Sequence, residues 1–162
     1  MVRCKRIDDR LTLIFTPHFP YNKTSQSRFR HTALIGIGGN VGDTLRRFEK
    51  LWWYLARLPM IDIEATSPIL KNPPFGYAEQ PDFDNAVMRI TTDLSPKALL
   101  RLMQRIERHF GRRRSFKNAP RTLDADILFY DDRTVRTETL SIPHPHWSER
   151  ESVLIPMQMI QR

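Results

Sequence analysis

The segment PRTLDADILFY, from Pro120 to Tyr130, constrains the fold of this chain more than any other. Polar and apolar residues alternate in its second half, and β-branched and aromatic residues close it, which is typical of a β-strand. Side chains two positions apart share one face of a strand, so Asp124 and Asp126 would project together, opposite to Ala125. The segment therefore predicts a strand with one apolar face and one face that carries paired carboxylates.

These two aspartates are candidate ligands for a hard cation. Their Cα atoms would lie roughly 6.5–7 Å apart in an extended strand. Mg²⁺ binds oxygen ligands, keeps several waters and is usually completed by substrate phosphates. A basic run that could clamp phosphate leads into the pair, and it contains Arg112, Arg113, Arg114, Lys117 and Arg121. The pattern indicates a nucleotide-phosphate enzyme; on this segment alone, the alternative is an exposed strand face beside a solvated run of charge.

The composition narrows the class of partner. A chain of 162 residues fits a single domain with a real core. Its 26 Lys and Arg residues exceed its 18 Asp and Glu residues, which favours an anionic partner such as a nucleotide, a nucleic acid or an acidic membrane. Cys4 is the single cysteine, which excludes an internal disulfide and fits a reducing cytoplasmic setting. No apolar run reaches the ~18 residues of a membrane span, so we expect no membrane partner.

Residues 1–31 form a basic extension in this interpretation, and residues 32–162 form the main domain. The run Leu11–Phe15 has the composition of a short strand, and the prolines and polar residues after it indicate a loop. The extension is therefore either a basic mobile tail or an added edge strand of the sheet.

Residues 32–162 predict an alternation of strands and helices. Two helix starts are strong, because Asp43 precedes an amphipathic run and Ser95 precedes Pro96 at the first helical position. In order, the expected elements are a strand at Ala33–Gly38, a helix from Asp43 to about Leu58, strands at Ile61–Lys71 and Asn85–Thr91, a helix from Ser95 that ends near Gly111, the strand that ends at Tyr130, hairpin strands within Val135–Ile142 and a short helix around Ser148–Ile155.

This order predicts an α+β domain of the ferredoxin-like, split βαβ type, with an antiparallel sheet and helices on one face. The other face would carry loops and the acidic pair. The glycines after the first strand do not complete a dinucleotide fingerprint, because the third glycine is replaced by Val41 and no Walker lysine follows. We interpret Gly36, Gly38 and Gly39 as turn and close-packing residues.

Several segments together resemble the 6-hydroxymethyl-7,8-dihydropterin pyrophosphokinase family. The resemblance covers about Ala33 to Met159. The matching segments are Lys117-x-Ala119-Pro120-Arg121-Thr122-Leu123-Asp124-Ala125-Asp126-Ile127-Leu128, Ile37-Gly38-Gly39-Asn40, Pro73-Pro74-Phe75-Gly76, Gln80-Pro81-Asp82-Phe83-x-Asn85-Ala86, Gln104-x-Ile106-Glu107, and Ile142-Pro143-His144-Pro145 with Arg150. The resemblance implies transfer of pyrophosphate from ATP to the hydroxymethyl group of 6-hydroxymethyl-7,8-dihydropterin, leaving AMP, in folate biosynthesis. It also implies two Mg²⁺ ions.

The resemblance assigns roles to individual residues. The metal ligands are Asp124 and Asp126, and the catalytic residues are Arg112, Arg121 and Asp126. The residues expected at ATP are Gln104, Glu107, Arg112, Arg114, Arg121, His144 and Arg150, with Arg113 as a spare. The residues expected at the pterin are Asn72, Pro73, Pro74, Phe75, Gly76, Phe83, Asn85 and Asp126.

Arginine suits the phosphate role because its planar fork pairs bidentately with oxygens and never titrates. Without the resemblance, the alternative interpretation of His144 is a residue of a rigid surface loop between two prolines. The alternative interpretation of Phe83 is a core residue. Gln104 and Glu107 would then be a solvated helix face.

Two positions depart from the family pattern. Ser152 stands where the family usually has an aromatic residue that closes the pterin sandwich; Trp147, Phe75 or a ring from the extension are the candidate replacements. Asn118 stands where relatives carry a tryptophan lid, which bears on loop closure over ATP.

Two other functions remain as alternatives at this stage. One is an RNA-binding module, because split βαβ sheets and basic charge are shared with RNA-recognition folds. The paired aspartates on the central strand would repel an RNA backbone, so we expect no nucleic-acid partner. The other is a pterin binder that has lost catalysis through Ser152. We expect the protein to be a monomer.

Overall fold

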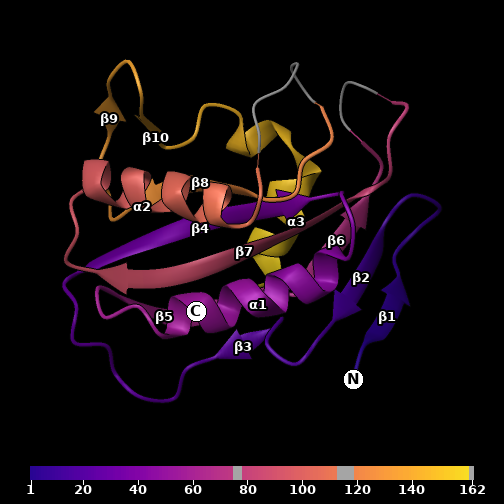
Figure 1. The fold of residues 1–162 in the computed structure, drawn as a ribbon, viewed down its shortest axis with the longest axis horizontal. Coiled ribbons are helices and arrows are strands. Elements are labelled where there is room, and N and C mark those ends of the chain that lie inside the picture. The colour runs from indigo at the N-terminus through magenta and orange to yellow at the C-terminus, as the bar shows by residue number, and fades with distance from the viewer. Residues whose placement is uncertain (75–77, 113–118, 161–162) are drawn as a thin grey trace.

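The computed structural model of the chain describes residues 1–74, 78–112 and 119–160. Figure 1 shows a central sheet crossed by two long helices. In chain order the elements are β1 (Arg3–Arg6), β2 (Thr12–Phe15), β3 (Tyr21–Asn22), β4 (His31–Gly39), α1 (Thr44–Ala56), β5 (Ile61–Thr66), β6 (Ile69–Asn72), β7 (Phe83–Thr92), α2 (Pro96–His109), β8 (Asp124–Tyr130), β9 (Val135–Arg136), β10 (Ser141–Ile142), a 3₁₀ turn (Trp147–Glu149) and α3 (Glu151–Met159).

The predicted split βαβ plan is confirmed. β4 and β7 pair at the centre of the sheet, β8 pairs with the free side of β4, and β5 and β6 both pair with the free side of β7. All of these pairs are antiparallel. α1 connects β4 to β5 and α2 connects β7 to β8, so each helix crosses between strands of one sheet.

Both predicted helix starts are confirmed by their capping bonds. The side chain of Asp43 accepts a hydrogen bond from the Arg46 N–H, and the Ser95 hydroxyl accepts one from the Ala98 N–H. Each bond satisfies one of the orphan N–H groups of a first helical turn. α2 ends just before Gly111, whose φ of 88° lies in the left-handed region that glycine adopts without strain.

The main core lies between the sheet and the two long helices. Figure 1 shows α1 and α2 on the same face of the sheet. Alternate residues of the central strands enter this core, including Ile35 of β4 and Ile127 of β8, and α2 contributes Leu99, which is fully buried. Replacement of a buried leucine by alanine typically costs about 2–5 kcal/mol, so the apolar face of α2 is essential to this packing.

One predicted strand is wrong in its extent. Ile61–Lys71 is divided into β5 and β6, and Ser67 and Pro68 separate the two. Proline has no N–H to donate to a ladder, so a regular strand cannot continue through it. The Ser67 hydroxyl accepts a hydrogen bond from the Val87 N–H instead, at 2.9 Å, which keeps the interruption attached to β7.

The predicted C-terminal helix is present but begins later. A 3₁₀ turn covers Trp147–Glu149, and α3 begins at Glu151 and runs to Met159. α3 packs against β6 and β7. Its residues Ser152 and Val153 line a cavity together with sheet residues that face away from α1 and α2, so α3 covers part of the opposite face.

The N-terminal extension lies within the sheet. β1 and β2 form an antiparallel hairpin, and β2 pairs with β6 through Leu13 opposite Leu70. Farther along, β3 pairs with β5. The described part of the extension therefore continues the sheet beyond β6 and reaches the neighbourhood of α3.

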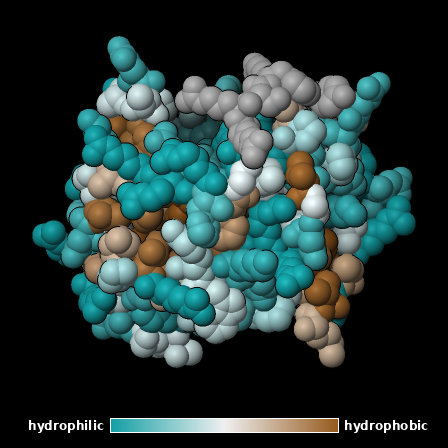
Figure 2. Space-filling view, viewed as in Figure 1, coloured by the Kyte–Doolittle hydropathy of each residue, from teal (hydrophilic) through white to brown (hydrophobic). Residues whose placement is uncertain are grey.

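The surface of the helix-bearing face is mostly hydrophilic. Figure 2 shows apolar residues on this face in small separate areas. Within the described residues, no helix has the length and apolar character needed to cross a membrane.

Candidate active site

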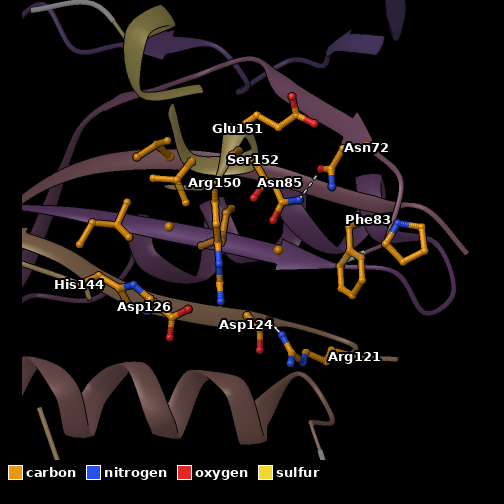
Figure 3. A pocket seen from close by; sticks show the side chains of 18 of the residues that line it. Asn72, Phe83, Asn85, Arg121, Asp124, Asp126, His144, Arg150, Glu151 and Ser152 are labelled. Carbon is orange, nitrogen blue, oxygen red and sulfur yellow. Dashed lines mark hydrogen bonds and ion pairs between the residues drawn. The ribbon is translucent and has the colours of Figure 1, made fainter. Parts of the chain in front are cut away.

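A cavity of about 450 Å³ opens on the face of the sheet opposite α1 and α2. Its floor is made by β4, β7 and β8, and its walls come from the segment after β10, from the start of α3 and from the N-terminal hairpin. Side chains of these strands alternate between the core and the cavity, as strand geometry requires. Figure 3 shows Asp124, Asp126, His144 and the tip of Arg150 gathered at one end of the cavity, which we call the charged end. Asn72, Asn85 and Phe83 lie toward the other end, which we call the amide end, and Arg121 and Glu151 lie on that side as well.

Two glycines at the end of β4 allow neighbouring groups to approach the strand closely. A Cβ atom on Gly38 would lie 2.5 Å from Asn85 Oδ1, and one on Gly39 would lie 2.5 Å from the Thr122 carbonyl oxygen. Neither distance is compatible with a side chain unless the neighbour moves. The interpretation of Gly38 and Gly39 as close-packing residues is confirmed, whereas their interpretation as turn residues is wrong, because all three glycines from Gly36 to Gly39 lie within β4.

At the charged end, Asp124 and Asp126 share one face of β8, as predicted, while Ala125 between them is buried in the core. Asp124 is paired with two arginines. Its Oδ1 lies 2.8 Å from Arg112 Nη1, and its Oδ2 lies 2.7 Å from Arg121 Nη1. The carboxylate of Asp124 therefore neutralises part of the positive charge of these two arginines.

Glu107 of α2 supports this cluster from beside the strand. Its Oε2 accepts a hydrogen bond from the Ala125 N–H at 2.9 Å and pairs with Arg112 Nη1 at 2.5 Å. Burial raises the pKa of Glu107, although the hydrogen bond from Ala125 and the charge of Arg112 oppose this shift. Arg112 is thus held between Glu107 and Asp124, which aims its guanidinium at the acidic pair.

Asp126 is the more exposed of the two aspartates. Its side chain is open to the solvent of the cavity. Even so, the protein around it reduces its hydration, and this raises the pKa of Asp126; the nearby charge of Asp124 raises it further. A second carboxylate this close makes the site receptive to a cation.

His144 and Arg150 complete the charged end. Figure 3 shows both side chains directed toward the two aspartates. The His146 N–H donates to His144 Nδ1 at 3.3 Å, so Nε2 carries the hydrogen of the neutral ring. Burial lowers the pKa of His144, with Asp126 opposing this shift, which favours the neutral imidazole as a hydrogen-bond donor.

The loop that carries Arg121 is braced by Asn40, a residue to which sequence reasoning gave no role. Asn40 is buried, its Oδ1 accepts from the Arg121 N–H at 2.9 Å, and its Nδ2 donates to Gln80 Oε1 and to the Pro81 carbonyl. Its position in the Gly-Gly-Asn segment was the one available signal. Through Asn40, the end of β4 holds the loops at both ends of the cavity.

At the other end of the cavity, Asn85 of β7 donates from Nδ2 to Asn72 Oδ1 at 2.7 Å. Asn72 in turn donates to the Pro73 carbonyl at 2.9 Å. This chain of bonds uses one of the two N–H groups of Asn85 and fixes the plane of its amide. Phe83, Pro73 and Pro74 line the same end and supply apolar surface.

The remaining predicted residues fall outside this cavity or outside the described chain. Phe75, Gly76 and Arg114 belong to segments that the structure does not describe, as do Arg113 and Lys117. Gln104 is exposed on α2 and does not line the cavity. Trp147, a candidate replacement for the aromatic missing at Ser152, packs edge-on against Phe129 at 5.0 Å between ring centroids. Ser152 itself lines the cavity.

Comparisons with known proteins identify the family of the chain. A family model described as 7,8-dihydro-6-hydroxymethylpterin-pyrophosphokinase matches residues 34–162. Several relatives carry the name 2-amino-4-hydroxy-6-hydroxymethyldihydropteridine pyrophosphokinase, among them proteins of Campylobacter jejuni, Helicobacter pylori and Synechocystis. The protein of Campylobacter jejuni is 42% identical over 142 residues, which cover 88% of this chain and 90% of the relative. The Helicobacter pylori protein is 40% identical over 145 residues, 88% of this chain and 89% of the relative. The Synechocystis protein is 38% identical over 141 residues, 87% of this chain and 72% of the relative. The chain belongs to the 7,8-dihydro-6-hydroxymethylpterin-pyrophosphokinase family.

Proposed function

We propose that the cavity binds ATP at its charged end and 6-hydroxymethyl-7,8-dihydropterin at its amide end, with the reacting groups meeting at Asp124 and Asp126. The enzyme is a pterin pyrophosphokinase of folate biosynthesis, which transfers pyrophosphate from ATP to the pterin hydroxymethyl group and releases AMP. The observation that carries the assignment of the site is the union of an acid–arginine cluster and a fixed amide pair in one cavity.

Magnesium fits the charged end. The donor set consists of carboxylate oxygens, which Mg²⁺ prefers, and the pKa of Asp126 is raised by the protein around it and by its acidic neighbour. Within the described residues, no group of three or more His, Cys, Asp or Glu side chains could hold a metal by itself. Asp124 and Asp126 would therefore hold the ions together with water and ATP phosphates. Bound magnesium supplies neutralisation of phosphate charge.

Arg112 and Arg121 act on the phosphates in this proposal. Both guanidinium groups are paired with Asp124. Their planar forks would pair with phosphate oxygens of the nucleotide and neutralise charge that develops during transfer. Arg112 is anchored for this role by Glu107, because that carboxylate is also bonded to the Ala125 N–H.

Neutral His144 donates a hydrogen bond from Nε2 to a phosphate oxygen, and Arg150 pairs with phosphate from the same wall. Asp126 orients the pterin hydroxyl beside the phosphate group that this hydroxyl attacks. Positioning of this kind supplies most of the catalysis in phosphoryl-type transfer, because the protein forms no covalent bond to the substrate.

The amide end reads the heterocycle. The amide of Asn85 is held in one plane by Asn72, so its remaining polar groups are preorganised for the edge of a flat ring system. Phe83 provides a face on which such a ring stacks. Asn72 and the prolines after it shape the end of this pocket.

The reaction is tested with ATP labelled in its β-phosphate, Mg²⁺ and the hydroxymethyl pterin. The wild-type protein is expected to form AMP and labelled pterin diphosphate in equal amounts. Asp126→Asn is expected to lose most of the transfer. Asp132→Asn, which removes an exposed carboxylate just after the same strand, is the matched control and should retain it. Absence of AMP formation by the wild-type protein would contradict the function.

We also propose that the enzyme depends on two Mg²⁺ ions, is a monomer and is cytoplasmic. These proposals are supported by the family resemblance, the single cysteine and the site described above. Analytical ultracentrifugation checks the oligomeric state, and activity against magnesium concentration after chelation checks the metal dependence.

A further inference from the structure

The N-terminal hairpin contributes a residue to the cavity. The family model begins to match at residue 34, and the hairpin β1–β2 precedes that point. Arg10, in the turn of this hairpin, nevertheless lines the cavity beside Arg150 and Ser152. The reaction outlined above gives Arg10 no task.

The turn that presents Arg10 is fixed by its own hydrogen bonds. Asp8 Oδ1 accepts from the Arg10 N–H at 2.8 Å and from the Leu11 N–H at 2.9 Å. The Ile7 N–H donates to the Leu11 carbonyl at 2.9 Å, which closes the loop between the two strands. An aspartate that bonds backbone groups two and three residues ahead is a strong turn-forming arrangement. The backbone of Arg10 is therefore held in place before its side chain makes any contact.

The side chain of Arg10 pairs with Glu151 through both of its terminal nitrogens. Nη1 lies 3.0 Å from Oε1 and Nη2 lies 3.4 Å from Oε2. Glu151 is the first residue of α3 and stands between Arg150 and Ser152 in the chain. The pair thus ties the hairpin to the short segment that forms one wall of the cavity.

Apolar packing connects the same two elements. Leu11, Leu13 and Leu70 form a small buried cluster separate from the main core, and Ile155 of α3 packs against it. Ile155 lies four residues after Glu151, which places the two on neighbouring turns of one helix face. The hairpin therefore holds α3 at two points, one apolar and one ionic.

We propose that Arg10 is a positioning residue for the pyrophosphokinase reaction: through Glu151 it sets the start of α3, and with it Arg150 and Ser152, against the cavity. This inference rests on the function proposed above. The guanidinium of Arg10 is engaged by Glu151 through both of its terminal nitrogens, and the test below distinguishes this positioning role from direct contact with a substrate. The hairpin is then a working part of the active site, not only an added edge of the sheet.

The test is a double-mutant cycle measured on the full-length enzyme. Initial rates are recorded for the wild type, Arg10→Ala, Glu151→Ala and the double variant, with each substrate varied in turn. Each single variant is expected to raise KM for both substrates by about 2- to 5-fold, the range for an exposed ion pair, with kcat changed less. The KM values of the double variant should be no higher than those of either single variant, because all three variants lose the same ion pair.

The charge-reversed pair, Arg10→Glu with Glu151→Arg, provides the sharper readout. Arg10→Glu alone places two carboxylates together and should give the highest KM, and reversal of the second charge should restore much of the loss. Lys5→Ala removes a positive charge from an exposed position on the same hairpin, away from the cavity, and is expected to leave KM unchanged. Thermal unfolding of every variant, followed by circular dichroism, should remain cooperative.

The possible outcomes separate the two proposals. The positioning role would be overturned if KM rises in Arg10→Ala but not in Glu151→Ala, or if the charge-reversed pair does not restore KM. Either result would mean that Arg10 contacts substrate directly. An active wild type with unchanged KM in all variants would also overturn it. Absence of activity in the wild type would instead contradict the proposed function.

Discussion

The two ends of the cavity are prepared for their ligands in different ways. At the charged end, the carboxylate of Asp124 is paired with both Arg112 and Arg121, so acidic and basic groups neutralise one another there. At the amide end, Asn85 is bonded to Asn72 and the plane of its amide is fixed. Under the proposed function, the nucleotide would bind among ion-paired groups, whereas the pterin would meet an amide that is held in place. Mutations at the two ends should separate catalysis and nucleotide binding from pterin binding.

The largest effect is expected at Asp124. Asp124→Asn removes a proposed magnesium ligand and leaves Arg112 and Arg121 without their shared carboxylate, so turnover should fall by about 10²–10³-fold, as for loss of one preorganised electrostatic group. The dissociation constant of the pterin, measured by calorimetry without nucleotide, should change little. Parallel loss of pterin binding and turnover would break the separation between the two ends.

The complementary change is Asn85→Ala. It removes the amide that reads the heterocycle and leaves Asn72 Oδ1 without its donor, so the pterin dissociation constant should rise about 10-fold or more. Binding of a non-hydrolysable ATP analogue with Mg²⁺ should stay near the wild-type value, and it serves as the internal control. An equal loss of nucleotide binding would indicate that Asn85 supports the whole cavity.

Asp84 precedes Asn85 on β7, does not line the cavity, and makes the stability of the fold sensitive to pH. Burial raises its pKa to about 6, and its Oδ1 has no hydrogen-bond partner among the described residues. The pKa of Asp84 is higher in the folded state than in the unfolded state. The contribution of this group to the free energy of unfolding is therefore most favourable below pH 4, and it is lost as pH rises toward 6. Asp84→Asn should raise the free energy of unfolding at pH 7 by about 1–3 kcal/mol and have little effect at pH 4.

Urea unfolding of the wild type and the variant at both pH values measures this effect. Equal gains at pH 4 and pH 7 would mean that the charge of Asp84 is not the cause.

The smallest expected effect concerns Ser152. Ser152→Phe places a ring in the cavity at the position where the family usually has an aromatic residue, and one stacking contact should lower the pterin dissociation constant by about 2- to 10-fold. Ser148→Phe adds a ring at an exposed position of the preceding turn and is the control. Weaker pterin binding in Ser152→Phe would show that the wall made by α3 has no room for a second ring.

Local sequence signals predicted much of the fold. Asp43 and Ser95 predicted the starts of α1 and α2, because each side chain accepts a hydrogen bond from an N–H only three residues ahead in the chain. The alternation in β8 placed Asp124 and Asp126 on one face because strand geometry leaves no other choice. These features depend on neighbours in the chain.

Features that depend on distant partners could not be predicted in the same way. Pro68 is a local signal for the division between β5 and β6, but the bond from the Val87 N–H to Ser67 Oγ that attaches the interruption to β7 joins residues 20 apart in the chain. Arg10 lies 141 residues from Glu151, and no local pattern connects the two. The pairing of Asp124 with Arg112, which follows α2, likewise arises only when α2 and β8 are packed together, whereas Arg121 lies only three residues from Asp124.

The central claim is that Asp124 and Asp126 hold magnesium for the nucleotide. Calorimetric titration of a non-hydrolysable ATP analogue, with and without Mg²⁺, tests it directly in the wild type and in the double variant Asp124→Asn/Asp126→Asn. We predict that Mg²⁺ strengthens binding strongly in the wild type and has little effect in the double variant, while both proteins still bind the pterin. A double variant whose nucleotide binding depends on Mg²⁺ as strongly as that of the wild type would contradict the account.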